Sequence, residues 1–244
     1  MKPPEPTYRS DGLTVYHGDC LAVMPALRPA SVDFVLTDPP YLVGFAGRWD
    51  GARRRIAGDD DPAWLAPAFA EVWRLLKPDS FCVSFYGWPH ADTFLGVWKA
   101  LGFRPVSHIA FVKRQWGFGR FTRSRHETAF LLAKGKPPKP ARAIADVIDW
   151  QRERAAAHPN QKPVASLRPL LASLCPPGGL VLDPFMGSGS TLLAARELGL
   201  PAVGIEVDPG YCRAAIRRLA PGRVRQPTLL VPSLTPDLFP ESDS

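Results

Sequence analysis

Short apolar runs alternate along this chain with longer stretches in which apolar residues recur every three or four positions. The short runs predict buried strands at residues 13–17, 32–36, 81–86, 106–112, 128–132, 180–182 and 202–205. The longer spacing predicts helices at residues 20–27, 64–76, 91–101, 164–174, 192–198 and 209–219. Because strands and helices alternate, we expect an α/β fold in which helices cover both faces of a mostly parallel sheet.

The pattern indicates one domain that spans residues 1–225. Residues 43–61 are rich in Gly, Arg and Asp and predict a loop, and residues 134–140 predict a turn or linker rich in Pro and Lys. Residues 226–244 contain four prolines and little periodicity. We therefore expect this tail to be disordered or draped over the surface.

Composition narrows the class of protein. No apolar stretch approaches the roughly 20 residues of a membrane span, and the amino-terminal segment lacks the apolar core of a signal peptide. The four cysteines are widely spaced and form no C-x-x-C pair: Cys20, Cys82, Cys175 and Cys212. We therefore expect no membrane partner, no metal site and no disulfide framework, and these features fit a cytoplasmic location.

The positive charge is concentrated in one part of the chain. The formal net charge is +7, and residues 104–142 contain ten bases and a single acid, Glu127. That segment alone carries +9, so the remaining residues sum to −2. A concentrated basic segment is typical of a protein that binds a polyanion, although an ordinary solvated surface would give the same pattern.

The most specific chemistry follows the predicted strand at 32–36, where the sequence reads Thr37-Asp38-Pro39-Pro40-Tyr41. Each proline ring fixes φ, and Pro40 also restricts Pro39 to extended geometry. An acid, a rigid carbonyl and an aromatic ring at the end of a strand can hold a flat heterocycle by an exocyclic amine. The motif therefore predicts an enzyme that acts on a base, and a proline-rich turn without chemistry is the alternative.

A second constellation follows the predicted strand at 180–182, in the stretch Asp183-Pro184-Phe185-Met186-Gly187-Ser188-Gly189-Ser190-Thr191. A glycine turn that opens a helix lets backbone N–H groups approach a ligand closely. Glu206 ends the next strand, where a carboxylate accepts hydrogen bonds from ribose hydroxyls. The two features together predict a site for a nucleoside cofactor.

The residues around this turn select among nucleoside cofactors. No Lys follows Gly189, which excludes a P-loop, and Leu192 stands where a dinucleotide motif has its third glycine. Asp183 would repel a pyrophosphate, whereas it suits a cationic ligand. S-adenosylmethionine carries a sulfonium and an ammonium group, and its adenosine fits Glu206.

Three motifs in this order, residues 37–41, His158-Pro159-Asn160-Gln161-Lys162-Pro163 and residues 183–191, resemble the DNA amino-methyltransferases of the N4/N6 family. The resemblance is to the β class and covers nearly all of residues 13–219. It implies a doubly wound, Rossmann-like methyltransferase fold with a seven-stranded mixed sheet. It also implies a circularly permuted motif order, in which the catalytic motif precedes the cofactor motif.

The resemblance implies roles for individual residues. The catalytic residues are Asp38, Pro39, Pro40 and Tyr41. Asp38 and the Pro39 carbonyl would accept both N–H bonds of the amine, and Tyr41 would stack on the base. The cofactor residues are Asp19 and Cys20 at the adenine, Gln161 and Lys162 near the methionine, and Asp183, Phe185, Gly187, Gly189 and Glu206.

The substrate implied is a base flipped out of double-stranded DNA, at a cost of a few kcal/mol of unstacking. Basic and aromatic side chains near the pocket would offset that cost: Arg48, Arg53, Arg54, Arg55, Lys113, Arg114, Trp116, Arg120, Arg123 and Arg125. They belong to the loop after Tyr41 and to a basic region at residues 104–157. The stretch between Arg114 and His158 is short for a dedicated recognition domain. Two hypotheses follow, specificity for only a few base pairs or a contribution from a partner subunit, and a homodimer is a further hypothesis.

Adenine N6 is favoured over cytosine N4 because the motif begins with Asp38, whereas cytosine enzymes of the family more often carry Ser there. Cytosine C5 chemistry needs a nucleophilic thiolate, usually after a proline, and the sequence has no Pro-Cys dipeptide. Cytosine-N4 methylation remains an alternative. A non-catalytic DNA-binding module that keeps the fold is an alternative of a different class.

Overall fold

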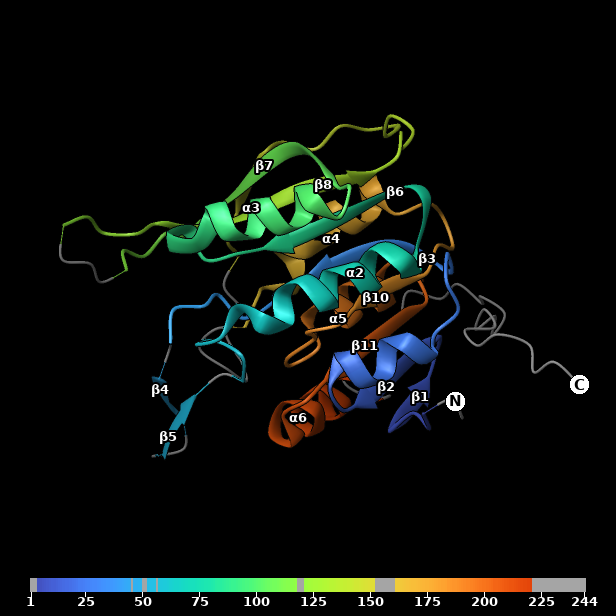
Figure 1. Ribbon diagram of the computed structural model, residues 1–244, viewed down its shortest axis with the longest axis horizontal. Helices are drawn as coiled ribbons and strands as arrows, with labels where there is room; N and C mark the ends of the chain where they lie inside the picture. Colours follow the sequence, from blue (N-terminus) through green and yellow to red (C-terminus); the bar gives the residue numbers. More distant parts are fainter. Residues whose placement is uncertain are drawn as a thin grey trace, which may run out of the picture.

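The computed structural model describes residues 4–44, 57–117, 121–151 and 161–220, and the backbone alone at 46–49 and 52–55 (Figure 1). Within this part of the chain the molecule has three layers, a central sheet with helices on each face. The predicted tail at 226–244 lies outside the described residues. The same is true of His158, Pro159 and Asn160 in the middle motif.

Nine strands of the described chain form one mixed sheet, in the order β1-β2-β11-β10-β3-β6-β8-β7-β9. The strands are β1 (Tyr8–Ser10), β2 (Leu13–His17), β3 (Val32–Thr37), β6 (Leu76–Phe85), β7 (Arg104–Val112), β8 (His126–Lys134), β9 (Val147–Asp149), β10 (Val181–Asp183) and β11 (Ala202–Glu206). The expected count of seven was wrong, because β1 and β9 add one short strand at each edge. Each has only three residues, too few to give an alternating pattern.

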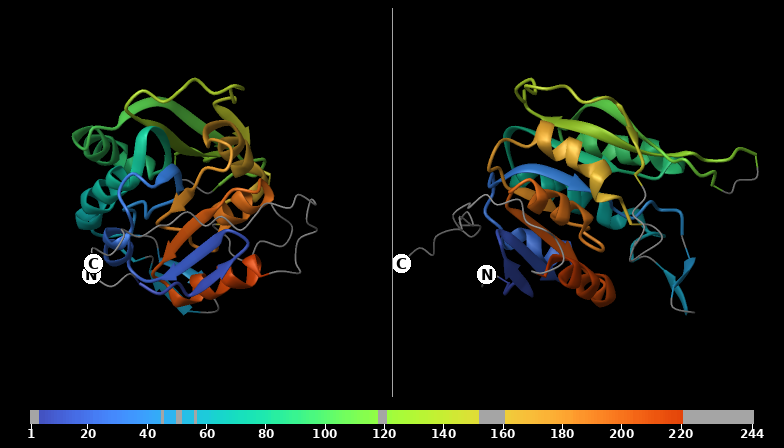
Figure 2. Two further views of the ribbon diagram at one scale, coloured as in Figure 1. Left: turned by 90° about the vertical axis from the view of Figure 1, so that its right-hand side faces the viewer. Right: turned by 180° about the vertical axis from the view of Figure 1, so that it is seen from behind.

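Two sets of helices cover the two faces. α1 (Cys20–Val23), α2 (Leu65–Leu75) and α3 (Ala91–Ala100) pack on one face, and α4 (Val164–Leu174), α5 (Ser190–Glu197) and α6 (Pro209–Leu219) pack on the other (Figures 1 and 2). In α2 the residues at helical spacing, including Leu65, Phe69 and Val72, are fully buried. Short 3-10 turns at Met24–Ala26, Pro62–Trp64 and Trp88–His90 complete the helical segments.

One predicted boundary was wrong. The chain passes from α2 directly into β6 at Leu76, although we expected Lys77-Pro78-Asp79 to separate a helix from a strand at 81–86. The register between β6 and β3 shifts between Leu76 and Phe81. Pro78 therefore lies in an irregular part of the strand, where its missing N–H removes no regular ladder bond.

The strand order places the functional site. β3 and β10 are parallel neighbours at the centre of the sheet, with Val35 opposite Leu182. From β3 the chain continues toward β6 on one side, and from β10 it continues toward β11 on the other. Ligands bind in α/β sheets outside the carboxyl ends of strands where the direction of winding reverses. Asp38 and Asp183 follow these two strands, so both belong to this crevice.

Two arms project from the molecule at the end where β3 terminates (Figures 1 and 2). One is a hairpin of β4 (Ala46–Trp49) and β5 (Ala52–Arg55). Its presence corrects the loop expected at 43–61. The other arm is the connection between β7 and β8, which begins at Lys113 and ends at Arg125.

Candidate active site

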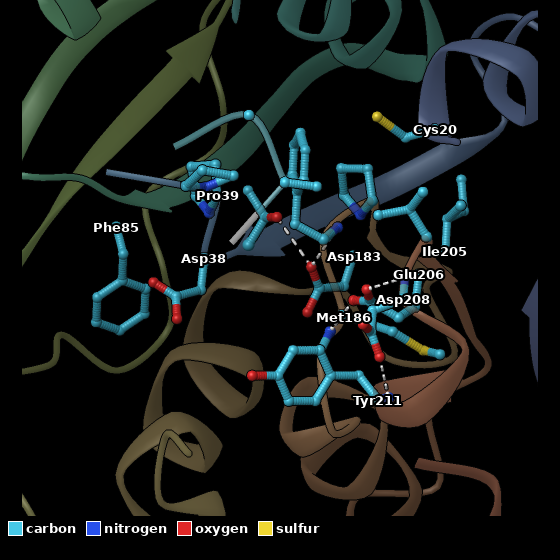
Figure 3. A pocket seen from close by; sticks show the side chains of 18 of the residues that line it. Cys20, Asp38, Pro39, Phe85, Asp183, Met186, Ile205, Glu206, Asp208 and Tyr211 are labelled. Carbon is cyan, nitrogen blue, oxygen red and sulfur yellow. Dashed lines mark hydrogen bonds between the residues drawn. The ribbon is translucent and has the colours of Figure 1, made fainter. Parts of the chain in front are cut away.

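A cavity of about 720 Å³ opens at the carboxyl ends of β3 and β10 (Figure 3). It brings together these residues from the predicted catalytic and cofactor sets: Asp19, Cys20, Asp38, Pro39, Pro40, Tyr41, Gln161, Lys162, Asp183, Phe185, Gly187 and Glu206. In Figure 3, Asp183 lies between Asp38 on one side and Glu206 on the other. The two motifs therefore form one continuous site.

Gly189 is the predicted cofactor residue that does not line this cavity. It caps α5 with φ of 81°, and a Cβ atom there would approach the Cβ of Ala215 on α6 to 3.1 Å. Glycine is needed at this position for the left-handed backbone and for the close approach of two helices. The structure thus places Gly189 at a helix contact.

Asp183 ends β10 as a buried acid. Its Oδ1 accepts a hydrogen bond from the Thr37 hydroxyl at 2.9 Å and another from the Phe185 N–H at 3.1 Å. Burial raises the pKa of the Asp183 carboxyl to about 7, against the lowering effect of hydrogen bonds from Thr191, Thr37 and Phe185. A cation beside this carboxyl would favour its ionised form, so the position suits a positively charged ligand.

Glu206 ends β11 and is 9% exposed. Its two oxygens accept backbone N–H bonds from Asp208 at 2.7 Å and from Gly187 at 2.9 Å. Burial nevertheless raises the pKa of the Glu206 carboxyl. An ionised carboxylate has about four acceptor positions, so Glu206 keeps capacity for the hydroxyls of a ligand.

The donor set of the cavity fits S-adenosylmethionine. Among the described lining residues are seven acids, Asp19, Asp38, Asp59, Glu127, Asp183, Glu206 and Asp208, and one base, Lys162. Such a lining would repel a phosphate cofactor and attract a cationic nucleoside. Trp64 packs edge-on against Phe185, with ring centroids 5.1 Å apart, and adds an aromatic wall for a flat ring.

The catalytic motif is tied to Lys162. The Nζ atom lies 2.5 Å from Asp38 Oδ2, and the Tyr41 hydroxyl donates to Asp38 Oδ1 at 2.7 Å. Burial raises the pKa of Asp38 overall, although the Lys162 charge acts to lower it. Burial would lower the pKa of Lys162, but the Asp38 and Glu127 carboxylates raise it well above its ordinary value.

Sequence reasoning assigned no role to Glu127, which faces the same lysine from β8. Its Oε2 lies 2.9 Å from Lys162 Nζ, and its Oε1 accepts a hydrogen bond from Lys113 Nζ at 2.5 Å. Burial opposes ionisation, but the two lysines lower the pKa of Glu127. The only sequence signal was that Glu127 is the single acid in the basic segment. The place of Trp64 in the cavity wall was also not predicted, since its spacing from the next apolar residues indicated only a helix face.

The predicted DNA-contact residues separate into several places. The backbone of Arg48, Arg53, Arg54 and Arg55 lies in the β4–β5 hairpin, and Arg120 lies outside the described residues. Arg114, Arg123 and Arg125 are exposed in the β7–β8 connection, where the Arg125 guanidinium lies 5.1 Å from the Trp116 ring centroid. Lys113 instead pairs with Glu127 inside the site.

The basic segment does not form one patch. Arg104 begins β7 and Lys134 ends β8, so they lie at the far end of strands that span roughly 30 Å from Lys113. Lys134 donates there to the carbonyls of Trp73 and Leu76. Only part of the +9 charge can therefore act beside the cavity.

Large aromatic side chains are exposed near the same end of the molecule. Trp116 is 61% exposed and Phe121 is 90% exposed, both in the β7–β8 connection. Trp88 is 81% exposed and follows Gly87, whose Cα packs closely against Tyr41. These rings are exposed to solvent and do not belong to the core.

In the described part of the chain, no group of three or more His, Cys, Asp or Glu side chains could hold a metal ion. Among the described residues, no helix is long and apolar enough to cross a membrane.

Known proteins with similar sequences point to one family. A family model described as DNA methylase matches residues 32–217. The Escherichia coli K12 protein YubD, named methylase, is 47% identical over 203 residues, which cover 83% of this chain and 88% of YubD. YhdJ of the same strain, named DNA adenine methyltransferase, is 27% identical, with 88% of this chain and 85% of YhdJ covered.

Solved structures confirm the methyltransferase fold. The complex of M1.HpyAVI with S-adenosylmethionine matches with a TM-score of 0.64 and 25% identity, over 84% of this chain and 99% of that chain. The cytosine-N4-specific PvuII DNA methyltransferase matches with a TM-score of 0.75 and 18% identity, over 91% of both chains. At that identity the likeness shows the fold alone.

The acidic cavity, the matched motifs and these relatives lead to one conclusion. The chain belongs to the DNA methylase family of N4 and N6 amino-methyltransferases, and it is a DNA methyltransferase that uses S-adenosylmethionine.

Proposed function

We propose that this enzyme methylates the N6 amine of an adenine flipped out of double-stranded DNA. The observation that carries the proposal is the Asp38 carboxylate, which lines the cavity where β3 ends beside β10. An ionised carboxylate accepts hydrogen bonds from an amine and offers no donor of its own. The adenine specificity in the name of YhdJ supports the choice of base.

Asp38 and the Pro39 carbonyl hold the two N–H bonds of the amine. The lone pair of an exocyclic amine is delocalised into the ring, so the nitrogen is a weak nucleophile until its geometry becomes tetrahedral. Two fixed acceptors favour that geometry and direct the lone pair across the cavity. The peptide bonds here are trans, and Pro39 is buried, so its carbonyl has little freedom to move.

S-adenosylmethionine supplies an electrophilic methyl group when it is bound on the Asp183 and Glu206 side of the cavity. Alignment of amine and methyl accounts for much of the rate enhancement in such a displacement. As the N–C bond forms, the bond from the methyl group to the sulfonium sulfur would break and leave the neutral thioether S-adenosylhomocysteine. The amine nitrogen gains positive charge, which the Asp38 carboxylate stabilises until one amine proton is lost to solvent. No residue of the chain becomes covalently attached to substrate.

Tyr41 has two tasks in this scheme. Its hydroxyl donates to Asp38 Oδ1 at 2.7 Å, so it occupies one acceptor that the amine needs. Entry of the base displaces the hydroxyl, and the ring then stacks on the base face. A base–aromatic stack contributes about 1–3 kcal/mol, which offsets part of the cost of flipping.

The two projecting arms hold the duplex. Arg114, Arg123 and Arg125 on the β7–β8 connection contact phosphates, and the β4–β5 hairpin contributes Arg48 and its neighbours from the other arm. Trp116 and Phe121 are exposed in the same connection as Arg114, Arg123 and Arg125, and their rings are suited to contact unstacked nucleotides. Phosphate contacts give affinity and register, and they do not select a sequence.

Product analysis tests the assigned base. Unmethylated plasmid DNA is incubated with the enzyme and S-adenosylmethionine, and the DNA is then hydrolysed to nucleosides for mass spectrometry. The proposal predicts N6-methyladenine. N4-methylcytosine would assign the alternative specificity, and the absence of any methylated base with intact cofactor binding would favour a DNA-binding module without catalysis.

A further inference from the structure

The ammonium group of Lys162 is surrounded by polar groups of the protein. It donates hydrogen bonds to Asp38 Oδ2 at 2.5 Å and to the Tyr41 hydroxyl at 3.2 Å, and it forms an ion pair with Glu127 Oε2 at 2.9 Å. Two carboxylates therefore already balance its single positive charge. The Lys162 side chain is only 9% exposed, whereas that of Asp38 is 30% exposed and lines the cavity.

Lys162 is itself held from behind. Glu127 on β8 faces it and is fixed by Lys113, whose Nζ lies 2.5 Å from Glu127 Oε1. Three consecutive ion pairs thus link the start of the β7–β8 connection to the cavity, with alternating positive and negative charges in the order Lys113, Glu127, Lys162 and Asp38. Lys162 also lies 4.8 Å from the Phe85 ring centroid, and Lys113 lies 4.6 Å from that of Trp150. These rings enclose the pair of lysines and limit their movement.

We propose that Lys162 is a positioning residue for Asp38: held by Glu127, it fixes the direction and the negative charge of the carboxylate that receives the amine. This inference rests on the proposed function of Asp38. It replaces the sequence-based hypothesis that Lys162 binds the methionine end of the cofactor. Asp38 thereby keeps an ionised form in a partly buried site, where an isolated carboxylate would tend to take up a proton.

Lys162 and Glu127 carry opposite charges, so they should have opposite effects on the pKa of Asp38. The charged and titratable groups that face Asp38 are Lys162, Glu127, Tyr41 and, on the neighbouring strand, Asp183. Lys162 lowers the pKa of Asp38, while the like charge of Glu127 raises it. Removing one of these charges must therefore move the acid limb of activity in the opposite direction from removing the other.

The test uses the full chain with the variants Lys162→Met and Glu127→Gln. Single-turnover methylation of duplex DNA is measured against pH, and binding of S-adenosylmethionine is measured by calorimetry. We expect Lys162→Met to slow methylation by about 100-fold at neutral pH, as for a displaced catalytic group, and to move the acid limb to higher pH. We expect Glu127→Gln to move the acid limb to lower pH. Lys162→Arg should restore the acid limb toward that of the wild type, because it returns the positive charge.

Cofactor binding separates this role from a cofactor contact. We expect the dissociation constant of S-adenosylmethionine to stay within about threefold in Lys162→Met, whereas loss of a charged contact would weaken it roughly tenfold or more. Weakened binding with an unmoved acid limb would overturn the proposal. Acid limbs that move in the same direction in both variants would do so as well.

Two controls keep the outcomes distinct. Lys77→Met removes another Lys–Asp pair, in which Nζ lies 2.7 Å from Asp33 Oδ1 outside the cavity, and it should leave both readouts unchanged. Asp38→Ala tests the proposed function itself. Full activity in Asp38→Ala would remove the basis of both proposals, whereas an inactive Asp38→Ala with a normal Lys162→Met would overturn the positioning role alone.

Discussion

The Nζ atom of Lys162 lies 2.5 Å from Oδ2 of Asp38, although 124 positions separate the two residues in the sequence. The pair forms because β3 delivers Asp38 to the carboxyl edge of the sheet, and the segment that precedes α4 crosses that edge. The contact joins a residue expected at the base to one expected at the cofactor. Through this ion pair, a residue expected at the cofactor affects the charge of the residue expected at the base.

Cofactor binding should depend on the ionisation of Asp183. The pKa of this carboxyl is about 7 in the free protein, so it carries a proton below that value and a negative charge above it. A cationic cofactor binds the ionised form more tightly, so affinity should rise as pH increases through about 7 and then level off. Calorimetry across that range checks the expectation.

The control for this titration is Asp183→Asn, which removes the charge and keeps the shape. In that variant the affinity should be lower at high pH and should lose most of its pH dependence. An equally steep dependence in Asp183→Asn would assign the titration to another group, such as Glu206.

The split of the basic segment predicts which arginines bind DNA. Neutralising Arg123 and Arg125 together should weaken DNA binding and reduce the salt slope by about 2, since each lost phosphate contact reduces it by about 0.9. Neutralising Arg104 and Lys136, at the other end of the β7–β8 hairpin, should leave the slope unchanged. Binding of one duplex, titrated over a range of salt concentrations, measures both pairs. Equal effects of the two pairs would contradict the assignment.

Gly189 should matter for stability. Alanine there would adopt φ of 81° and place its Cβ 3.1 Å from Ala215 Cβ. We expect Gly189→Ala to lower the free energy of unfolding by about 1–2 kcal/mol, mainly through backbone strain. Denaturant unfolding monitored by circular dichroism gives the value. An unchanged midpoint together with lost cofactor affinity would return Gly189 to the cofactor site.

Much of the fold could be predicted because local patterns coincide with tertiary burial. The predicted bounds of β2, α4 and α6 match the structure, since each has apolar residues at the spacing of its element and clear turn residues at its ends. The β4–β5 hairpin was missed because its residues are mostly Gly, Ala and Arg. They carry no alternating apolar pattern to mark a strand.

The site was predictable in its parts but not in its pairings. The residues around Asp38 and Asp183 could be predicted from their sequence motifs, because the local backbone geometry requires Pro and Gly there. Lys162 reaches Asp38 from the segment before α4, and Glu127 contacts Lys162 from β8. No local sequence pattern predicts which side chains will meet across a sheet edge. The charge of the 104–142 segment misled for the same reason, since the β7–β8 hairpin places the middle of the segment at one end of the strands and the beginning and end of the segment at the other.

In the proposed function, the Asp38 carboxylate receives the amine of the base. The most direct test is single-turnover methylation by Asp38→Asn and Asp38→Ala, with S-adenosylmethionine binding measured on the same preparations and Asp92→Asn, an exposed acid on α3, as the matched control. We expect both Asp38 variants to bind the cofactor while methyl transfer falls by at least about 100-fold, and we expect the control to behave as wild type. Substantial methyl transfer by Asp38→Ala would contradict the proposed function.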